Sequence, residues 1–437
     1  MAGDYQEAVR RIESFAATHL AREPVAGASI ALTDENGLIA EITWGHANLE
    51  RGRPVEPGTV FPIASIAKTM TAACILQQAD NGALALDEPM ATYLPWLPLE
   101  GVTVRHLLTH TGGLIGGMEV SPSTAGESRS LLELPRGRPG ERFHSSNIGY
   151  GVLGLVLEAV SGRPYGDVLH DGILEPLGMT RSSAITDQLL QLRAARGYVF
   201  AGDDASKEGW DSLVPAPWIA TDSGAGSACC PAADLATFLR ALLRGGDPIL
   251  TPESFELMTT PGIEGSWYGC GLVVDTLDGH PLVGHDGDCP GFQSHMWADP
   301  QAKVGVVVLW SGPGSTEAIV DHGLALLRAA RAGEPLPPDP APAAPKEATG
   351  TAARSHAYAG TYRCHNPWIP YVRILTTEAG LQLQYPWGAA EPLELLDGGE
   401  YRVGEEGSPE RACFSDEIDG HPLYVNVSGQ RFDRTPW

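Results

Sequence analysis

The pattern Ser65-x-x-Lys68, at the start of an apolar stretch of helical character, constrains this chain more than any other feature. Residues i and i+3 of a helix lie about one turn apart, so the lysine amine can reach the serine hydroxyl. A free serine is a weak nucleophile near neutral pH and needs a neighbour that accepts its proton. The pattern therefore predicts that Ser65 is a nucleophile activated by Lys68.

The residues around this pattern place Ser65 at the beginning of a helix. The stretch Thr69–Ala79 is mostly apolar, and Asn81-Gly82 after it is typical of a helix end. Unpaired backbone N–H groups and the helix dipole favour a developing anion at a helix N-terminus. This position therefore suits a serine that carries negative charge during a reaction.

Composition limits the classes of protein to consider. The chain has 437 residues, more than one domain usually contains, and 43% of them are hydrophobic, as in globular proteins. Its formal charge of −25 argues against nucleic acid or an anionic membrane as a partner. The first residues lack the basic start and apolar core of a signal peptide, and no apolar run could span a bilayer. We therefore expect a cytoplasmic protein.

The cysteines do not indicate a metal or disulfide framework. Seven cysteines occur, and no two of them form a Cys-x-x-Cys pair. An odd number in a cytoplasmic chain is best explained by reduced thiols. We expect neither a bound metal nor a cofactor.

Strand and helix patterns alternate along the first three quarters of the chain. Residues 26–33 and 38–44 are expected to form a hairpin, with residues 34–37 as its turn. Further strands are expected at 270–274, 281–285, 292–298 and 304–310, and further helices at 148–160 and 316–331.

A change of composition divides the chain near its C-terminal end. Residues 334–354 are rich in Pro and Ala and read as a linker, which separates a domain of residues 1–333 from one of residues 355–437. The last part alternates short strand patterns with Gly, Pro and Asp. It is therefore expected to be a small all-β barrel or sandwich.

Two further motifs carry chemical groups. Ser145-Ser146-Asn147 precedes the helix at 148–160, where a hydroxyl and an amide could relay a proton and hold a substrate carbonyl. His285-Asp286-Gly287 ends a predicted strand, where glycine permits the close approach of a substrate backbone. The N–H groups of Ser65 and Asp288 could then form an oxyanion hole.

Structural readings compete with these assignments. Ser145, together with Ser146, could act only as a helix N-cap, and His285 could be a hydrogen-bonded histidine of the strand. A metal held by His285 with its neighbouring aspartates is disfavoured, because residues that alternate along a strand rarely close a coordination shell. Structural or packing roles are expected for His106, His110, Tyr150 and Cys289.

Four motif blocks in a fixed order resemble the serine β-lactamase and penicillin-binding-protein superfamily, and within it the class C-like serine hydrolases. The resemblance covers residues 5–330 and rests on Ser65-x-x-Lys68 and residues 104–114, 147–154 and 284–292. It implies an α+β fold with an antiparallel sheet flanked by helices and an all-helical subdomain. The part after the linker resembles the lipocalin-like barrel of some relatives.

The chain departs from the usual family pattern at two motifs. Class C-like members usually carry Tyr-x-Asn, but Ser145 stands in place of the tyrosine, as in classical penicillin-binding proteins. His285 opens the third motif, where Lys-Thr-Gly is frequent. The resemblance implies catalytic roles for Ser65, Lys68, Ser145 and His285, and substrate binding by Asn147, Gly287 and Asp288.

The resulting hypothesis is a serine hydrolase or acyltransferase that acts on an amide or ester, with a small-molecule or peptide-like acyl substrate. The alternatives are a penicillin-binding-protein-type thioesterase or peptide cyclase, a small-ester carboxylesterase, and a non-catalytic β-lactam-binding protein. The sequence does not determine the acyl group, the acceptor or the oligomeric state.

Overall fold

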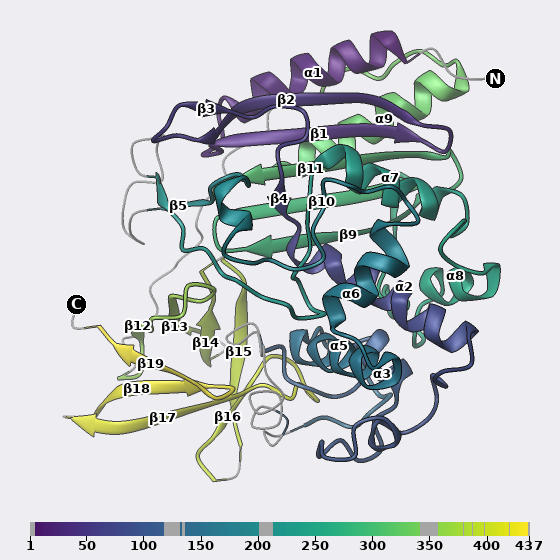
Figure 1. Cartoon of the computed structure of the whole chain (residues 1–437). Coiled ribbons are helices and arrows are strands. Elements are labelled where there is room, and N and C mark those ends of the chain that lie inside the picture. The colour runs from purple at the N-terminus through teal and green to yellow at the C-terminus, as the bar shows by residue number, and fades with distance from the viewer. Residues whose placement is uncertain are drawn as a thin grey trace. The chain divides into compact units, whose positions relative to one another are not determined.

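The computed structural model describes residues 5–117, 132, 136–200, 213–340 and 357–435, the last range without positions 379, 387, 397 and 419 (Figure 1). The chain divides into two compact units. The first comprises residues 1–88 and 152–341, and the second comprises residues 89–151 and 342–437. Within the described ranges, every helix is too short or too polar to cross a membrane.

The first unit contains an antiparallel sheet of seven strands in the order β3-β2-β1-β11-β10-β9-β8. The predicted hairpin is formed by β1 and β2, and the Asp34 carboxylate holds its turn by accepting the N–H groups of Asn36 and Gly37. The strands are β1 (Gly27–Asp34), β2 (Leu38–Asn48), β3 (Arg53–Pro54), β8 (Val273–Leu277), β9 (His280–Cys289), β10 (Phe292–Asp299) and β11 (Val304–Ser311).

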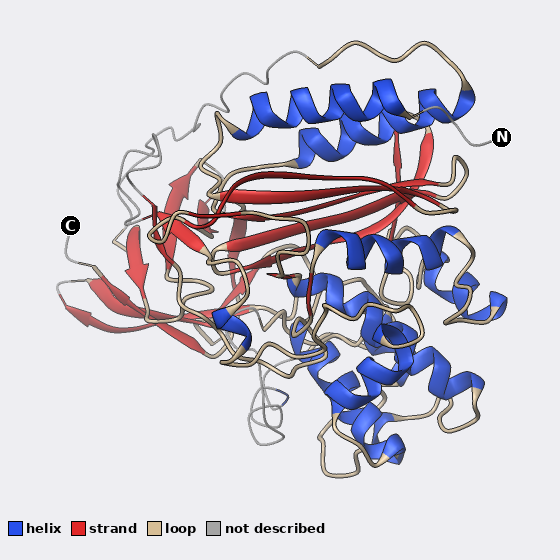
Figure 2. Cartoon of the chain, turned by 45° about the horizontal axis from the view of Figure 1, so that its top comes forward, coloured by secondary structure: helices blue, strands red, loops and turns tan. Residues whose placement is uncertain are grey.

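Helices cover both faces of this sheet. Helices α1 (Gln6–Leu20) and α9 (Glu317–Ala332) lie on one face, and α7 (Ala232–Leu243) lies on the other (Figures 1 and 2). Side chains such as Ile30 and Val308 pack against α1 and α9 in one core. Because helices cover both of their faces, the central strands β1 and β11 are buried at every position.

Helix α2 (Ala67–Asp80) is buried over its first ten residues, and smaller helices pack against it. Its Thr71 hydroxyl lies 2.9 Å from the hydroxyl of Tyr165 in α6 (Tyr165–Leu169) and donates to the carbonyl of Gly224 at 2.7 Å. These bonds fix the end of α2 that follows Ser65. The shorter elements of this unit are β4 (Phe61–Pro62), β5 (Tyr198–Phe200), β6 (Leu213–Pro215), β7 (Cys229–Cys230) and α8 (Pro252–Thr259).

One predicted strand is displaced. The expected strand at 270–274 is observed as β8 over Val273–Leu277, because Gly271 has a φ of 76° and its N–H bonds the carbonyl of Gly269 in a tight turn. The predicted helix at 148–160 is found as α5 (Asn147–Ser161), and the one at 316–331 is α9. The error therefore concerns one boundary and leaves the order of the elements unchanged.

The second unit combines α3 (Val104–Leu108), the start of α5 and a closed C-terminal barrel of eight antiparallel strands. Tyr362, Val372, Leu383, Val425 and Phe432 are among the side chains that fill the barrel. The predicted α+β class with a C-terminal barrel is therefore confirmed. The barrel strands are β12 (Gly360–Arg363), β13 (Tyr371–Thr377), β14 (Gly380–Gln384), β15 (Ala390–Leu395), β16 (Tyr401–Val403), β17 (Arg411–Ile418), β18 (His421–Val427) and β19 (Gln430–Arg434).

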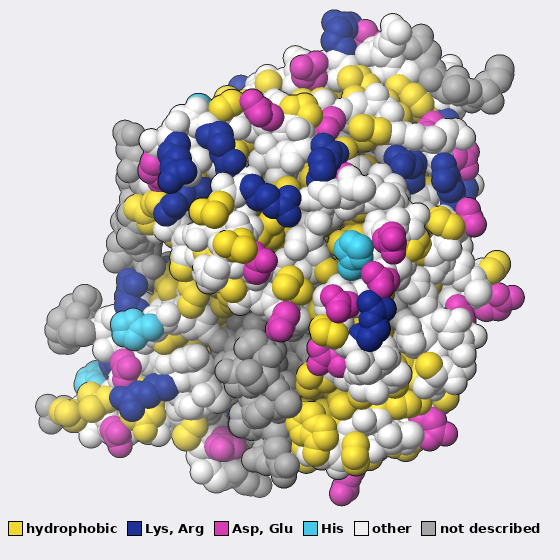
Figure 3. All heavy atoms as spheres, in the orientation of Figure 1, with side chains coloured by type: hydrophobic (Ala, Val, Ile, Leu, Met, Phe, Trp, Pro, Cys, Tyr) yellow, Lys and Arg dark blue, Asp and Glu magenta, His cyan; other side chains and the backbone are white. Residues whose placement is uncertain are grey.

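Charged side chains are mixed on the face drawn in Figure 3. Lys and Arg side chains lie among Asp and Glu there, and neither sign forms one continuous patch. The excess of negative charge in the composition is therefore not gathered on this face.

Candidate active site

Ser65 lies on a strained turn in the first unit. It is the middle residue of a 3₁₀ turn, η1 (Ala64–Ile66), which leads directly into α2. Ala64 has a φ of 46°, a left-handed conformation that is uncommon for a residue with a Cβ. The residue before the turn is anchored, because the carbonyl of Ile63 accepts a hydrogen bond from the hydroxyl of Ser294 at 2.9 Å. Backbone strain of this kind persists where the surroundings enforce it, often at functional sites.

Lys68 is placed as the sequence pattern predicts. Its Nζ forms a hydrogen bond with Oγ of Ser65 at 2.6 Å, and only 2% of the residue is exposed. Burial lowers the pKa of Lys68 from its ordinary value to about 7. A large fraction of the amine is therefore neutral near pH 7 and able to accept a proton from the serine.

The imidazole of His285, on β9, is neutral and makes two hydrogen bonds. Its Nδ1 lies 2.6 Å from the carbonyl oxygen of Asp286, which can only accept, so Nδ1 carries the hydrogen. Its Nε2 then accepts the hydroxyl of Tyr268 at 2.9 Å. Burial, with a further contribution from the charge of Lys68, lowers the pKa of His285 to about 4. His285 is thus uncharged at neutral pH, unlike the lysine often found at this motif.

Gly287 brings β9 against the turn that carries the candidate nucleophile. A Cβ at this position would lie 2.2 Å from the carbonyl oxygen of Ile63 and 2.5 Å from Oγ of Ser294. Only glycine fits such an approach without moving the backbone. Asp288 follows opposite Gln293 of β10. Asp288, whose N–H is the predicted oxyanion donor, therefore directly follows the tight contact between Gly287 and Ile63.

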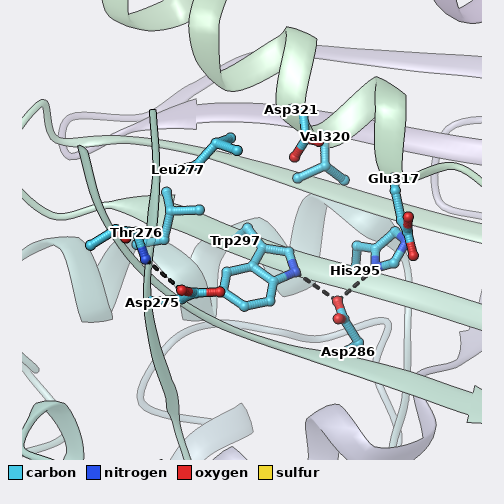
Figure 4. A pocket seen from close by; sticks show the side chains of 10 residues that line it. Asp275, Thr276, Leu277, Asp286, His295, Trp297, Glu317, Val320 and Asp321 are labelled. Carbon is cyan, nitrogen blue, oxygen red and sulfur yellow. Dashed lines mark hydrogen bonds and ion pairs between the residues drawn. The ribbon is translucent and has the colours of Figure 1, made fainter. Parts of the chain in front are cut away.

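Asp286 points to the opposite face of β9 from His285. Its Oδ1 accepts Nδ1–H of His295 and Nε1–H of Trp297, each at 2.6 Å. These side chains border a cavity of about 190 Å³, into which Glu317 of α9 also projects (Figure 4). Successive residues of the motif therefore point away from one another, as the two-residue period of a strand requires.

Ser145 and Asn147 belong to the second unit, at the start of α5. The hydroxyl of Ser146 accepts the N–H of Gly149 at 3.1 Å and donates to the carbonyl of Ile115 at 2.6 Å. Ser146 is therefore the residue that caps α5. Ser145 is not needed as a cap, and its side chain is exposed.

The histidines and the tyrosine near this motif support its loop. His106 closes a capping box with Thr103 at the start of α3. Nδ1 of His110 accepts the N–H of Ser146 at 3.0 Å, and the buried Tyr150 hydroxyl donates to the carbonyl of Leu108 at 2.7 Å. Each of these polar groups thus has a partner in the protein that explains its position.

Two residues of the site were not predicted from the sequence. Tyr268 bonds His285, and Ser294 supports the turn before Ser65, yet neither belongs to a motif with a recognisable spacing. The Tyr268–His285 bond joins residues 17 positions apart, and the Ser294–Ile63 bond joins residues 231 positions apart. Only the folded sheet brings these partners together.

Other reactive groups are less suitable for catalysis. Burial raises the pKa of the Cys289 thiol well above its ordinary value, which makes it a poor nucleophile at neutral pH. Among the described residues, His170, Asp171 and Glu175 place possible metal-ligand atoms within 4.8 Å of one another. All three are exposed, and Asp171 already pairs with Arg163 at 2.7 Å.

Comparisons with known proteins identify the family. The Beta-lactamase family profile matches residues 12–330. A Bacillus subtilis (strain 168) relative, which its name assigns to the penicillin-binding proteins, is 31% identical over 252 residues, covering 56% of this chain and 61% of that protein. The chain thus spans less than two thirds of that relative's length.

Two solved structures extend the comparison. The octameric penicillin-binding protein homologue from Pyrococcus abyssi is 27% identical with a TM-score of 0.67, covering 97% of this chain and 99% of that one. The D-amino acid amidase from Ochrobactrum anthropi SV3, complexed with D-phenylalanine, is 25% identical with a TM-score of 0.65, covering 74% of this chain and 99% of that one. Since the family profile spans most of the chain and the fold agrees, this protein belongs to the Beta-lactamase family.

Proposed function

We propose that this protein is a serine hydrolase or acyltransferase that forms an acyl-enzyme on Ser65 with a peptide-like amide or ester. The observation that carries the proposal is the 2.6 Å hydrogen bond between Ser65 Oγ and a buried Lys68 amine whose pKa lies at about 7. A lysine with an ordinary pKa would be protonated and could not act as a base.

The proposed reaction begins when the neutral Lys68 amine takes the proton of Ser65. Oγ then bonds to the substrate carbonyl carbon, and the electron pair of the carbonyl moves to its oxygen. The backbone N–H groups of Ser65 and Asp288 are the proposed donors to this oxyanion. When the carbon–nitrogen or carbon–oxygen bond breaks, the proton held on Lys68 passes through Ser145 to the leaving group.

The second half of the reaction frees the enzyme. Attack by water on the ester bond of the acyl-enzyme gives hydrolysis, whereas attack by an amine gives transfer or cyclisation. In either case Lys68 accepts the proton of the incoming group, and that proton returns to Ser65 Oγ when the ester bond breaks. Asn147 is the proposed ligand of the acyl side chain, and its amide can both donate and accept hydrogen bonds.

The favoured substrate class is an amide whose acyl part is a D-amino-acid residue. The likeness to a D-amino acid amidase and to penicillin-binding proteins supports this choice. A matched set of D- and L-aminoacyl amides, p-nitrophenyl esters and a penicillin tests it. Turnover of the D-amides above the L-amides supports the proposal. Turnover of esters alone would favour a carboxylesterase, and labelling by penicillin without any turnover would favour a binding protein.

Acid should inactivate the enzyme reversibly, with a midpoint near pH 7. Lys68 must be neutral to act as a base, so kcat/KM should fall as the pH drops below the pKa of about 7 and level off above it. Initial rates on a p-nitrophenyl ester across this range provide the measurement, with samples returned to neutral pH as the control. A profile that stays level down to pH 5 would exclude Lys68 as the base.

Substitutions of the adjacent residues Ser145 and Ser146 should affect catalysis and stability, respectively. Ser145→Ala is expected to lower kcat on the order of 10²-fold, the usual scale of general acid–base help, with an unchanged melting temperature. Ser146→Ala is its matched control and should cost about 1 kcal/mol of stability, because it removes the cap of α5. Steady-state kinetics and thermal unfolding on both variants measure the two effects. Full activity of Ser145→Ala would show that the hydroxyl relays no proton.

A further inference from the structure

Glu410 of the C-terminal barrel is a buried carboxylate that the proposed reaction does not use. It lies between β16 and β17, directly before Arg411, and only 9% of the residue is exposed. Its Oε1 accepts the backbone N–H of Gly116 at 2.6 Å and lies 3.0 Å from Nε2 of His144. Its Oε2 accepts the hydroxyl of Ser428. A carboxylate that is withdrawn from water needs such donors.

The hydrogen bonds keep Glu410 ionised. Burial alone raises the pKa of this carboxyl, but the bonds from His144, Ser428 and Gly116 outweigh burial and hold the pKa below its usual value. An ionised carboxylate can only accept, so Nε2 of His144 carries a hydrogen and donates it. Charge-assisted hydrogen bonds of this kind are roughly twice as strong as neutral ones.

These bonds hold both sides of the segment that carries Ser145. His144 is the residue directly before Ser145, and its ring bonds Glu410. On the other side, the carbonyl of Gly116 accepts the N–H of Asn147 at 2.7 Å, while the N–H of the same Gly116 bonds Glu410. The exposed Ser145 side chain therefore lies between two points that one barrel carboxylate fixes.

A second contact connects the same segment with the barrel. The guanidinium of Arg142 donates to the carbonyl of Glu406, and a Cβ at Gly407 would lie 3.0 Å from Nη1 of Arg142. The barrel side is itself anchored, because the N–H of Ser428 bonds the carbonyl of Arg411 at 2.8 Å. The barrel thus provides a fixed support for residues 142–147.

We propose that Glu410 is a positioning residue, which orders the Ser145-Ser146-Asn147 motif through His144 and Gly116 and makes the barrel part of the catalytic apparatus. The inference rests on the proposed function of Ser145 as a proton relay. Glu410 touches neither the substrate nor the reacting atoms in this account. Its contribution is to hold Ser145 and Asn147 at the place where they act.

The test compares Glu410→Ala and Glu410→Gln in the full chain with Glu400→Gln, which changes an exposed barrel carboxylate between β15 and β16. A misplacement of about 1 Å can cost 10²-fold in rate, so Glu410→Ala should lower kcat on a D-aminoacyl amide, whose amine leaving group needs a proton, by about that factor. Glu410→Gln, which keeps one accepting oxygen, should lose less. Glu400→Gln should match the wild type.

A double variant distinguishes positioning from general destabilisation. Once Ser145→Ala has removed the hydroxyl, adding Glu410→Ala should lower kcat little further, because the two changes then affect one step. Losses that multiply would show that Glu410 acts elsewhere. An unchanged kcat in Glu410→Ala alone would overturn the proposal directly.

Amide hydrogen exchange gives a readout that does not need catalysis. In Glu410→Ala, the amides of residues 144–149 should exchange faster than in the wild type, while those of the sheet strands β1 and β11 keep their protection. Unchanged exchange in residues 144–149 would refute the ordering role even if activity were lost. Should Ser65→Ala retain turnover, the proposed function would fail, and this measurement would still decide whether Glu410 orders the motif.

Discussion

Ser65→Ala is expected to abolish both turnover and covalent labelling by a fluorophosphonate or a penicillin. The substitution removes the only atom proposed to bond to the substrate, and no other group is proposed to replace it. The fold should persist, since Ser65 is partly exposed in the turn before α2 and the substitution removes its side-chain hydrogen bond to Lys68. Turnover assays, labelling on a gel and thermal unfolding measure these three outcomes. Retention of more than a few per cent of the activity would rule out Ser65 as the nucleophile.

Lys68→Met should be almost as damaging to activity. Nucleophile and base act as one unit, so we expect a loss of kcat on the order of 10⁴-fold or more. The size and apolar character of methionine suit the buried position of Lys68. Steady-state kinetics on esters and amides provide the measurement, and normal activity would require a different base.

The same variant should be more stable than the wild type at pH 7. Burial lowers the pKa of Lys68 to about 7, so between this pH and the ordinary lysine value near 10.5 the unfolded chain binds a proton that the folded chain does not. The stability of the wild type therefore falls as the pH drops through that range. The stability of Lys68→Met does not fall for this reason, because methionine does not titrate. Urea unfolding at pH 7 and pH 10 should show the larger gain at pH 7. A variant that is both inactive and less stable would point to a structural cause.

Local sequence patterns account for the parts of the site that lie close together in the chain. The spacing of Ser65 and Lys68 specified a contact within one helical turn, and the structure has it at 2.6 Å. Ordered motif blocks predicted the family, which the family profile confirms. The fold class followed from the same resemblance. A two-residue strand period predicted that the C-terminal part is all-β.

Contacts between distant segments could not be predicted in the same way. Alternation along a strand does not say whether a small β unit closes on itself. The barrel was predicted from the resemblance alone, and the pairing of β12 with β19 closes it. Adjacent serines at positions 145 and 146 look alike as helix caps, and the structure distinguishes them because the Ser146 hydroxyl accepts the N–H of Gly149 and donates to the carbonyl of Ile115. The bond between Gly116 and Glu410 spans 294 residues and has no motif at either end.

The measurement that tests the account most directly is mass spectrometry of the intact protein during turnover. Acid quenching shortly after mixing with a penicillin or an activated D-aminoacyl ester should trap a species heavier by the acyl group. Peptide mapping should place the adduct on Ser65, and Ser65→Ala should show none. An adduct on another residue, such as Cys289, or full turnover without any covalent species, would contradict the acyl-enzyme on Ser65.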